Sequence, residues 1–203
     1  MLKYGTDKPD LRNPLIIHDL TSFFADREFV EINGRTIPFK NKLVRGIVAN
    51  YLVKRDGEGD GKKAFEKAID TYSRSIGMKF GCGYITLEDG EFKGPIAKFL
   101  TEDQKAELCE ICGIKEGDSL FFISDAPAVI NKLAGEMRTW IANELGLIKN
   151  DSFEFCFIVD FPMYEYNEEA KKIDFTHNPF SMPQGGMDAL LNKDPLEIFA
   201  YQY

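Results

Sequence analysis

Strand-like and helical segments alternate between residues 29 and 146, and this alternation constrains the fold more than any other feature of the chain. Residues 62–76 and 127–145 place apolar side chains at the three- and four-residue spacing of amphipathic helices, and a glycine follows each segment. Residues 43–53 and 119–124 are apolar runs of the kind that form buried strands. The sequence therefore predicts an α+β fold with a packed core.

Two turn signals add hairpins to this pattern. An Asn-Gly pair at residues 33–34 predicts a tight hairpin over residues 29–39, because these residue types readily adopt the positive φ angles that such turns require. An Asp-Gly pair at residues 89–90 predicts a second hairpin over residues 84–97, in which Pro95 should interrupt the second strand.

The C-terminal part of the chain is also predicted to form β-structure. Residues 153–161 are almost all apolar or aromatic, which favours a strand in the middle of a sheet, ended by Pro162. Residues 164–166 and 173–176 flank a polar loop and are predicted to pair as antiparallel strands. The composition changes near residue 20 and again near residue 150, so we expect boundaries there.

Composition and charge narrow the functional classes. Of the 203 residues, 44% are hydrophobic, as a packed core requires, and no run approaches the roughly eighteen apolar residues of a membrane span. The N-terminus has no apolar signal region, so we expect a cytoplasmic protein without a membrane partner. The net charge of −8 opposes nucleic-acid binding by the chain as a whole.

Residues 35–80 are more basic than the rest of the chain. They hold eleven Lys or Arg residues against five acidic residues. Candidates for contact with a polyanion are Lys54, Arg55, Lys62 and Lys63. The alternative is an ordinary solvated surface with charges on several faces.

The four cysteines lie in segments that are predicted to be core: Cys82, Cys109, Cys112 and Cys156. Cys109 and Cys112 form a C-x-x-C pattern, but it falls at the end of a short predicted helix, and no second pair completes a zinc site. We expect reduced, buried thiols and no metal ligand set.

Two polar segments flanked by prolines, residues 4–12 and 175–183, are the candidate binding elements. Proline fixes φ and removes a backbone donor, so each segment is suited to hold side chains in place. A proline two residues after His177 gives its imidazole a fixed direction, and an imidazole can recognise a carboxylate. Asp7 and Lys8 are adjacent opposite charges that suit a zwitterionic ligand, with an ordinary surface turn as the alternative.

Several kinds of enzyme site have no counterpart in this sequence. It has no P-loop, no G-x-G-x-x-G after a strand, and no evident Ser-His-Asp or Cys-His arrangement. Its only histidines are His18 and His177, so few acid–base groups are available. We therefore expect no complete active site within the chain.

In the two proline-flanked segments and in several shorter stretches between them, the chain resembles bacterial-type aspartyl-tRNA synthetases, which are class II enzymes. Segments of that family's catalytic domain are matched by residues 4–12, 159–162 and 177–180. The GAD domain, which is inserted into that catalytic domain, is matched by residues 94–100, 117–122 and 145–147. The resemblance covers essentially the whole chain.

The resemblance implies a three-part organisation. Residues 21–150 would form a GAD-type α+β insertion domain, flanked by two pieces of a class II catalytic domain with an antiparallel sheet, residues 1–20 and 151–203. The family activates aspartate with ATP and Mg²⁺ to aspartyl-adenylate and then transfers the aspartyl group to tRNA(Asp). The implied parent enzyme is a cytoplasmic homodimer.

The resemblance also implies roles for individual residues. His177 resembles the histidine that lines the aspartate pocket, and Asp7 resembles an acid near the substrate ammonium. Lys8, Arg12 and Asn178 would support that pocket. Asn178 stands where many members have a second histidine, and this variant resembles enzymes that charge both tRNA(Asp) and tRNA(Asn).

Parts of the family's pattern are missing from this chain. It lacks the anticodon-binding domain, the dimer-forming first motif, the ATP-binding second motif and the third motif. The resemblance therefore implies a ligase fragment that is inactive alone and binds no cofactor itself.

One alternative is a self-sufficient RNA-binding or interaction module that uses the basic residues 35–80. Another is a fragment of a tRNA-dependent amidotransferase subunit, which would explain the middle of the chain but not its ends.

Overall fold

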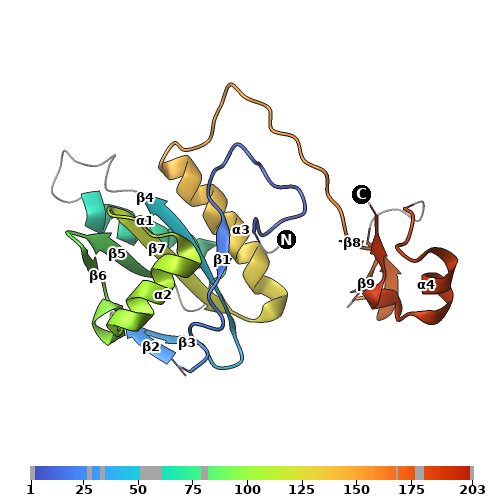
Figure 1. Cartoon of the computed structure of the whole chain (residues 1–203), viewed down its shortest axis with the longest axis horizontal. Helices are drawn as coiled ribbons and strands as arrows, with labels where there is room; N and C mark the ends of the chain where they lie inside the picture. The colour runs from blue at the N-terminus through green and yellow to red at the C-terminus, as the bar shows by residue number, and fades with distance from the viewer. Residues whose placement is uncertain are drawn as a thin grey trace. The chain divides into compact units, whose positions relative to one another are not determined.

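The computed structural model describes residues 3–26, 29–32, 35–50, 61–78, 82–167, 169–176 and 181–201. The chain forms two compact units, Met1–Phe153 and Glu154–Tyr203 (Figure 1). In this described part of the chain, no helix combines the length and the apolar character that crossing a membrane would need.

The first unit is built on a five-stranded antiparallel sheet with the strand order β1-β4-β7-β5-β6. Its strands are β1 (Ile17–Asp19), β4 (Leu43–Asn50), β5 (Gly83–Glu88), β6 (Glu91–Lys93) and β7 (Asp118–Asp125). The central pair is β4 and β7, which are aligned from Leu43 opposite Asp125 to Asn50 opposite Asp118. These two strands confirm the buried strands predicted from the apolar runs at residues 43–53 and 119–124, although residues 51–53 lie outside the described part.

The predicted hairpins are confirmed in different degrees. The strands β2 (Phe29–Ile32) and β3 (Arg35–Pro38) pair as expected, and their Asn-Gly turn lies outside the described residues. In the second hairpin, β5 pairs with β6, but β6 ends at Lys93 and the prediction of a strand up to residue 97 is wrong. Gly94 takes a φ of 125°, which turns the chain away from the sheet just before Pro95.

The described part of this unit also contains three α-helices, α1 (Gly61–Ser75), α2 (Glu102–Cys112) and α3 (Pro127–Glu144), and the 3-10 helix η2 (Ala97–Phe99). The start of α2 is a capping box, in which the backbone N–H of Gln104 donates to Thr101 Oγ1 at 3.3 Å and the N–H of Thr101 donates to Gln104 Oε1 at 3.1 Å. Gly113 follows with a φ of 65°, which ends the helix. The helices predicted from periodicity are therefore confirmed.

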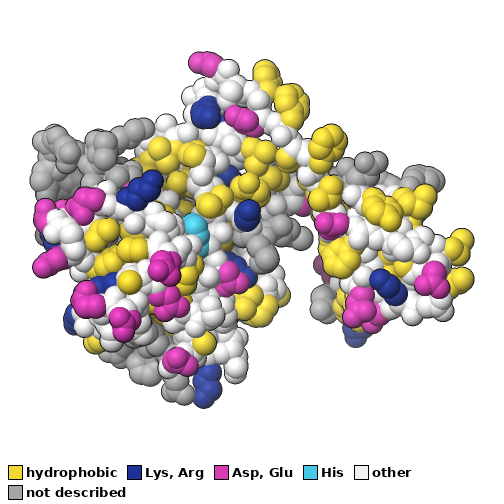
Figure 2. All heavy atoms as spheres, in the orientation of Figure 1, with side chains coloured by type: hydrophobic (Ala, Val, Ile, Leu, Met, Phe, Trp, Pro, Cys, Tyr) yellow, Lys and Arg dark blue, Asp and Glu magenta, His cyan; other side chains and the backbone are white. Residues whose placement is uncertain are grey.

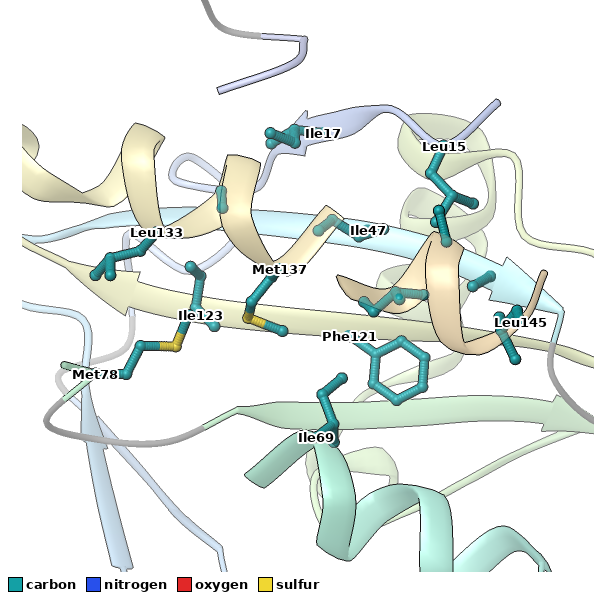
Figure 3. Packing of buried hydrophobic residues seen from close by; sticks show 14 of the residues in the cluster. Leu15, Ile17, Ile47, Ile69, Met78, Phe121, Ile123, Leu133, Met137 and Leu145 are labelled. Carbon is teal, nitrogen blue, oxygen red and sulfur yellow. The ribbon is translucent and has the colours of Figure 1, made fainter. Parts of the chain in front are cut away.

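Apolar side chains fill both faces of the sheet, and β7 contributes to each. Phe121 and Ile123 belong to the cluster that α1 and α3 cover (Figure 3). Leu120 and Phe122 belong to a second cluster, together with Leu108 of α2. Alternate side chains of a strand point to opposite faces, so the middle of β7, residues 120–123, is apolar because both of its faces are covered. Burial of each phenylalanine contributes about 2–3 kcal/mol.

The apolar stripe predicted for α3 packs largely as expected. Trp140 is half-buried and stacks on Tyr72 of α1, with ring centroids 5.0 Å apart. It also lies 5.8 Å from the ring of Phe65, so aromatic contacts join α1 to α3. Val129 departs from the prediction, since 42% of it is exposed near the start of the helix.

The second unit is made of short antiparallel pairs. The strands β9 (Tyr164–Asn167) and β10 (Lys172–Phe175) pair, which confirms the hairpin predicted there. The strands β8 (Phe161–Pro162) and β11 (Phe199–Ala200) pair as well. Between β10 and β11 lie α4 (Gly186–Asn192) and η3 (Pro195–Glu197). Among the described residues of this unit, the buried apolar side chains include Phe161, Met163, Ala189, Ile198 and Ala200.

The strand predicted over residues 153–161 is wrong for most of its length. Residues 152–159 have no regular secondary structure, and Phe153, Phe155 and Phe157 are 88%, 90% and 91% exposed. Hydrophobic side chains accordingly lie at the surface along this segment (Figure 2). A strand forms only when a neighbour accepts its backbone hydrogen bonds, and no strand in the described part of the chain pairs with these residues.

Candidate functional site

The N-terminal segment, defined as residues 3–16, lies against helix α3 and leads into β1. Gly5 has a φ of 73°, and a Cβ atom on it would lie 2.4 Å from the carbonyl oxygen of Asn131 and 2.5 Å from the Cα of Gly135. A Cβ on Gly135 would in turn lie 3.1 Å from Gly5. The position of Gly5 therefore requires glycine, and a side chain at Gly135 would push the segment away by a few tenths of an ångström, because the two backbones touch here.

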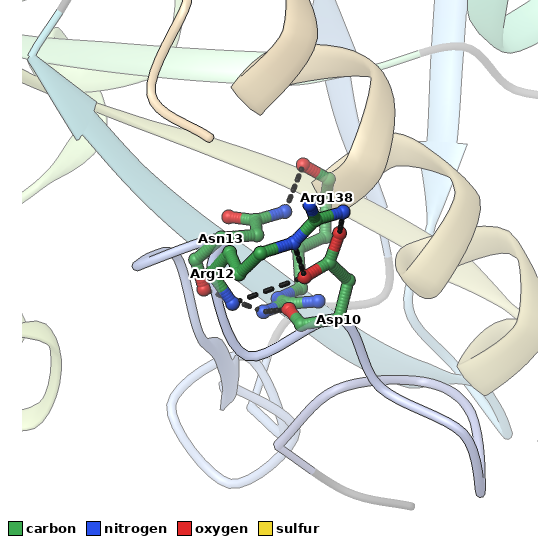
Figure 4. Close-up of polar contacts among 4 residues, drawn as sticks. All are labelled: Asp10, Arg12, Asn13 and Arg138. Atoms are coloured by element: carbon green, nitrogen blue, oxygen red, sulfur yellow. Dashed lines mark hydrogen bonds and ion pairs between the residues drawn. The ribbon is translucent and has the colours of Figure 1, made fainter. Parts of the chain in front are cut away.

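The buried side chain of Arg138 on α3 holds the same segment by hydrogen bonds (Figure 4). Its Nε donates to the carbonyl oxygen of Leu15 at 2.5 Å, and its Nη2 donates to those of Asp10 and Asn13 at 3.1 Å and 2.8 Å. The residue is 2% exposed, and its guanidinium carbon lies 5.0 Å from the centroid of the Tyr4 ring. Burial lowers the pKa of Arg138, but an arginine with several acceptors stays charged.

Asn13 completes this contact from the other side. Its Nδ2 donates to the carbonyl oxygen of Arg138 at 3.2 Å, and its Oδ1 accepts from the backbone N–H of Leu15 at 3.0 Å. Asn13 is 3% exposed. The exchange of hydrogen bonds between Asn13 and Arg138 fixes the register of the segment on the helix, because a displacement would leave several buried polar groups without partners.

Arg12, predicted to support an aspartate pocket, is bound to Asp10 in the same segment. Its Nε donates to Oδ1 at 2.9 Å and its Nη2 to Oδ2 at 2.8 Å, and its backbone N–H donates to Oδ1 at 3.0 Å. The hydrogen bonds from Arg12 lower the pKa of Asp10, and the same contact raises the pKa of Arg12. This two-bond pair closes the turn that carries the Asp10 carbonyl toward Arg138.

Asp7 and Lys8 lie between the Gly5 contact and this turn. Asp7 is half-buried, and its Oδ1 accepts a long hydrogen bond of 3.4 Å from the Thr6 hydroxyl. The backbone N–H of Lys8 donates to Thr6 Oγ1 at 3.2 Å, and the Lys8 side chain is exposed. The structure thus places both charges on a stretch of backbone that is held on each side.

A second buried arginine, Arg45 on β4, binds Asp19 and Thr21, which come shortly after the N-terminal segment. It is 3% exposed, and its Nη1 lies 2.7 Å from Asp19 Oδ1 and donates to Thr21 Oγ1 at 3.2 Å. Its Nε donates to Asn131 Oδ1 of α3 at 3.1 Å. Burial raises the pKa of Asp19, but hydrogen bonds from Thr21 and the charge of Arg45 outweigh it, so the net shift is downward.

Neither arginine was expected from the sequence. The pattern of α3 was interpreted through its apolar residues alone, although Arg138 stands four residues after Ala134 and three before Ile141, which are both buried. A cation at that spacing on an apolar face is the signal that could have identified it. Its acceptors are backbone carbonyls of distant residues, which no local pattern reveals.

The remaining predicted site residues stay predictions. His177 and Asn178 lie outside the described residues, as do Lys54 and Arg55. Lys62 and Lys63 lie in α1, and their side chains are likewise outside the described part. The structure therefore tests neither the predicted role of His177 in an aspartate pocket nor the predicted tRNA-facing surface.

The cysteines differ in their surroundings. Cys112 is buried in the cluster beneath α2, and burial raises the pKa of its thiol to about 12. Cys82 and Cys109 are half-buried, and burial raises the pKa of both. Cys156 is exposed, so its prediction as a core residue is wrong for the same reason as the strand around it.

Comparison with known proteins assigns the central part of the first unit. Residues 46–134 match the GAD domain, so the α+β region around β4, β7 and α2 is a domain of this class. The match ends four residues before Arg138 and begins one residue after Arg45. Both buried arginines thus lie just outside the residues that it covers.

The full chain is similar to aspartate–tRNA(Asp/Asn) ligases. It is 48% identical over 204 aligned residues to the aspartate–tRNA(Asp/Asn) ligase of Wolbachia pipientis subsp. Culex pipiens (strain wPip). It is 45% identical over 204 residues to the ligase of the same name from Ehrlichia chaffeensis (strain Arkansas). All of this chain is covered in both comparisons, against 33% of each relative. The homologues of this chain are aspartate–tRNA ligases, it corresponds to a segment of them, and it spans about a third of their length, which confirms the resemblance inferred from the sequence.

Proposed function

We propose that this chain contributes the GAD domain and part of the aspartate pocket to an aspartate–tRNA ligase. The observation that carries this proposal is the 48% identity to such a ligase along the entire chain. In this proposal the ligase activates aspartate with ATP and transfers the aspartyl group to tRNA in the cytoplasm. Residues 21–150 form its insertion domain, and residues 1–20 and 151–203 belong to its catalytic domain.

In this proposal two walls of the aspartate pocket come from the two ends of the chain. Asp7 binds the substrate ammonium, and His177 contacts a substrate carboxylate with support from Asn178 and Lys8. Fixed charges in a protected pocket discriminate a small dicarboxylic amino acid better than mobile ones do. The attachment of residues 3–16 to α3 supports this role, since it restricts the backbone on which Asp7 stands.

In this proposal the parent ligase uses ATP and Mg²⁺, and neither is assigned to residues of this chain. Among the described residues, no group of three or more His, Cys, Asp or Glu side chains is arranged to hold a metal ion. A homodimeric parent enzyme is likewise part of the proposal.

We further propose that the ligase charges both tRNA(Asp) and tRNA(Asn). Relatives in Wolbachia and Ehrlichia carry both tRNAs in their names, and this chain has Asn178 at the variable pocket position. The test is aminoacylation of each purified tRNA with radiolabelled aspartate by the ligase that contains this chain. Charging of tRNA(Asp) alone would contradict the dual specificity and leave the ligase activity standing.

The ligase activity and the pocket have a separate test. We expect aspartate-dependent exchange of pyrophosphate into ATP by the ligase, and none by residues 1–203 alone. In the ligase, His177→Ala should lower kcat/KM for aspartate about 10- to 100-fold, because a hydrogen bond to a charged group contributes about 1.5–3 kcal/mol. Its KM for ATP should change little.

The matched control is His18→Ala, which removes the other histidine of the sequence. His18 is half-buried on β1, and its variant should keep the KM for aspartate. Equal losses for aspartate and ATP in His177→Ala would refute the pocket assignment. Pyrophosphate exchange by residues 1–203 alone would refute the proposal that this chain is inactive without the rest of the ligase.

A further inference from the structure

The segment that carries Asp7 is held from both sides by helix α3. On one side, Gly5 touches the backbone of Asn131 and Gly135. On the other side, the carbonyl oxygen of Asp10 accepts a hydrogen bond from Arg138 at 3.1 Å. Asp7 lies between these two contacts, so its position is set by the helix and not by the short turn alone.

We propose that Arg138 is a positioning residue for aspartate recognition, acting through the N-terminal segment on Asp7. This inference rests on the proposed function, because it concerns the same pocket. It adds a residue that touches no substrate and lies outside the residues matched to the GAD domain. Through Arg138, helix α3 of the first unit controls how well the ligase binds aspartate.

The shape of the guanidinium explains why an arginine is needed. One planar group reaches three carbonyl oxygens, those of Asp10, Asn13 and Leu15. A lysine ammonium carries the same charge but is compact and lacks the spaced donors of the planar fork. Replacement by lysine therefore keeps the charge and loses most of the hold on the segment.

Arg12 acts on the same carbonyl from the outside. Its two side-chain bonds to Asp10 close the turn, and that turn directs the Asp10 carbonyl inward to Arg138. In this arrangement the contribution of Arg12 to the pocket is to shape the backbone. Asp7 is then the substrate-facing charge of the segment, and Arg12 and Arg138 hold its frame.

The first test uses steady-state kinetics of pyrophosphate exchange in the full ligase. For Arg138→Lys we expect the KM for aspartate to rise about tenfold, since a misplacement of roughly 1 Å can cost up to about 100-fold. The KM for ATP should change less than about twofold. The matched control is Lys132→Ala, which removes an exposed cation from the same helix and should change neither constant.

A second variant moves the segment without touching the buried cation. In Gly135→Ala the new methyl group would lie 3.1 Å from the Cα, carbonyl carbon and oxygen of Gly5, so the segment must shift by a few tenths of an ångström. We expect a smaller rise in the KM for aspartate, in the same direction. This variant decides the matter if Arg138→Lys fails to fold.

A structural measurement separates this inference from the proposed function. In residues 1–203, amide hydrogen exchange over residues 4–15 should become faster in Arg138→Lys and stay unchanged in Lys132→Ala. Unchanged exchange would overturn the inference, because Arg138 would not hold the segment. The inference would also be overturned if hydrogen exchange becomes faster in Arg138→Lys but the folded Arg138→Lys ligase keeps normal KM values for aspartate and ATP. An equal rise of both KM values would overturn it too. A wild-type ligase without aspartate-dependent pyrophosphate exchange would instead refute the proposed function, and hydrogen exchange would still decide whether Arg138 holds the segment.

Discussion

Strand β7 and residues 153–159 are two apolar runs with opposite fates. In β7, Leu120, Phe121 and Phe122 are at most 1% exposed, whereas Phe155 and Phe157 are 90% and 91% exposed. The local sequences predict a buried strand in both places. The difference is that β7 has β4 on one side and β5 on the other, with helices over both faces, and residues 153–159 have no paired strand among the described residues. Burial is thus a property of the partners, which the run itself does not encode.

The largest expected effect contrasts phenylalanines from the two runs. Phe122→Ala should lower the free energy of unfolding of the first unit by about 3–5 kcal/mol, because it leaves a cavity in the core. Phe155→Ala should change it by less than about 0.5 kcal/mol. Urea unfolding followed by the fluorescence of Trp140, the single tryptophan, measures both. Similar losses in the two variants would show that Phe155 is packed in solution and would break the comparison.

Two cations of helix α3 extend the contrast from apolar to charged side chains. Arg138→Met should destabilise the first unit by about 3 kcal/mol, since it leaves the carbonyls of Asp10, Asn13 and Leu15 without their donor. Lys132→Met, on an exposed position, should stay within about 0.5 kcal/mol. The same urea titration serves here. A loss below about 1 kcal/mol for Arg138→Met would mean that water replaces its hydrogen bonds.

The exposed run should also make the chain associate with itself. Phe153, Phe155 and Phe157 present aromatic surface to solvent, and such surface promotes contact between molecules. We expect the weight-average mass in sedimentation velocity to rise with concentration, and the double variant Phe155→Ser/Phe157→Ser to reduce that rise. A chain that stays monomeric at all concentrations would show that this run is shielded.

The smallest expected effect compares carboxylates in the two units at low pH. Hydrogen bonds from Arg12 lower the pKa of Asp10, and hydrogen bonds from Lys172 lower that of Asp174. Because the folded-state pKa is below the unfolded value of about 4, each stabilisation is complete above that pH. It is then lost as the pH falls through the lower, folded-state pKa.

Arg12→Gln should therefore raise the pKa of Asp10 toward about 4 and leave that of Asp174 unchanged. Carboxyl chemical shifts in an NMR titration report both groups separately. An unchanged pKa of Asp10 in this variant would mean that Arg12 is not its main partner in solution.

Local sequence patterns predicted secondary structure correctly where residues close in the sequence determine the element. The helices at residues 62–76 and 127–145 and most of the apolar stripe of α3 were predicted correctly, because neighbouring residues determine each of them. The strand up to residue 97 failed because Gly94 adopts a positive φ that an alternating pattern does not reveal.

The candidate site was less predictable than the fold. The sequence singled out Asp7 and Arg12 as polar residues near prolines, but it did not indicate that Arg12 is bound to Asp10 or that Arg138 holds their backbone. The contacts of Arg138 join residues that are more than 120 positions apart, such as Arg138 and Leu15. Nothing in a single sequence links Arg138 to backbone carbonyls so far away in the chain, so only the three-dimensional structure shows these contacts.

The close approach of Gly5 to Gly135 has a consequence for engineering this protein. If residues 21–150 were replaced by a linker in the proposed ligase, every residue of the N-terminal segment would remain, but the surface on which it rests would be lost. A GAD domain grafted from another protein would keep this contact undisturbed only with a glycine at the position of Gly135 and an arginine one turn away at that of Arg138. The useful cutting points for such chimaeras therefore lie beyond the end of α3 and not at the ends of the family match.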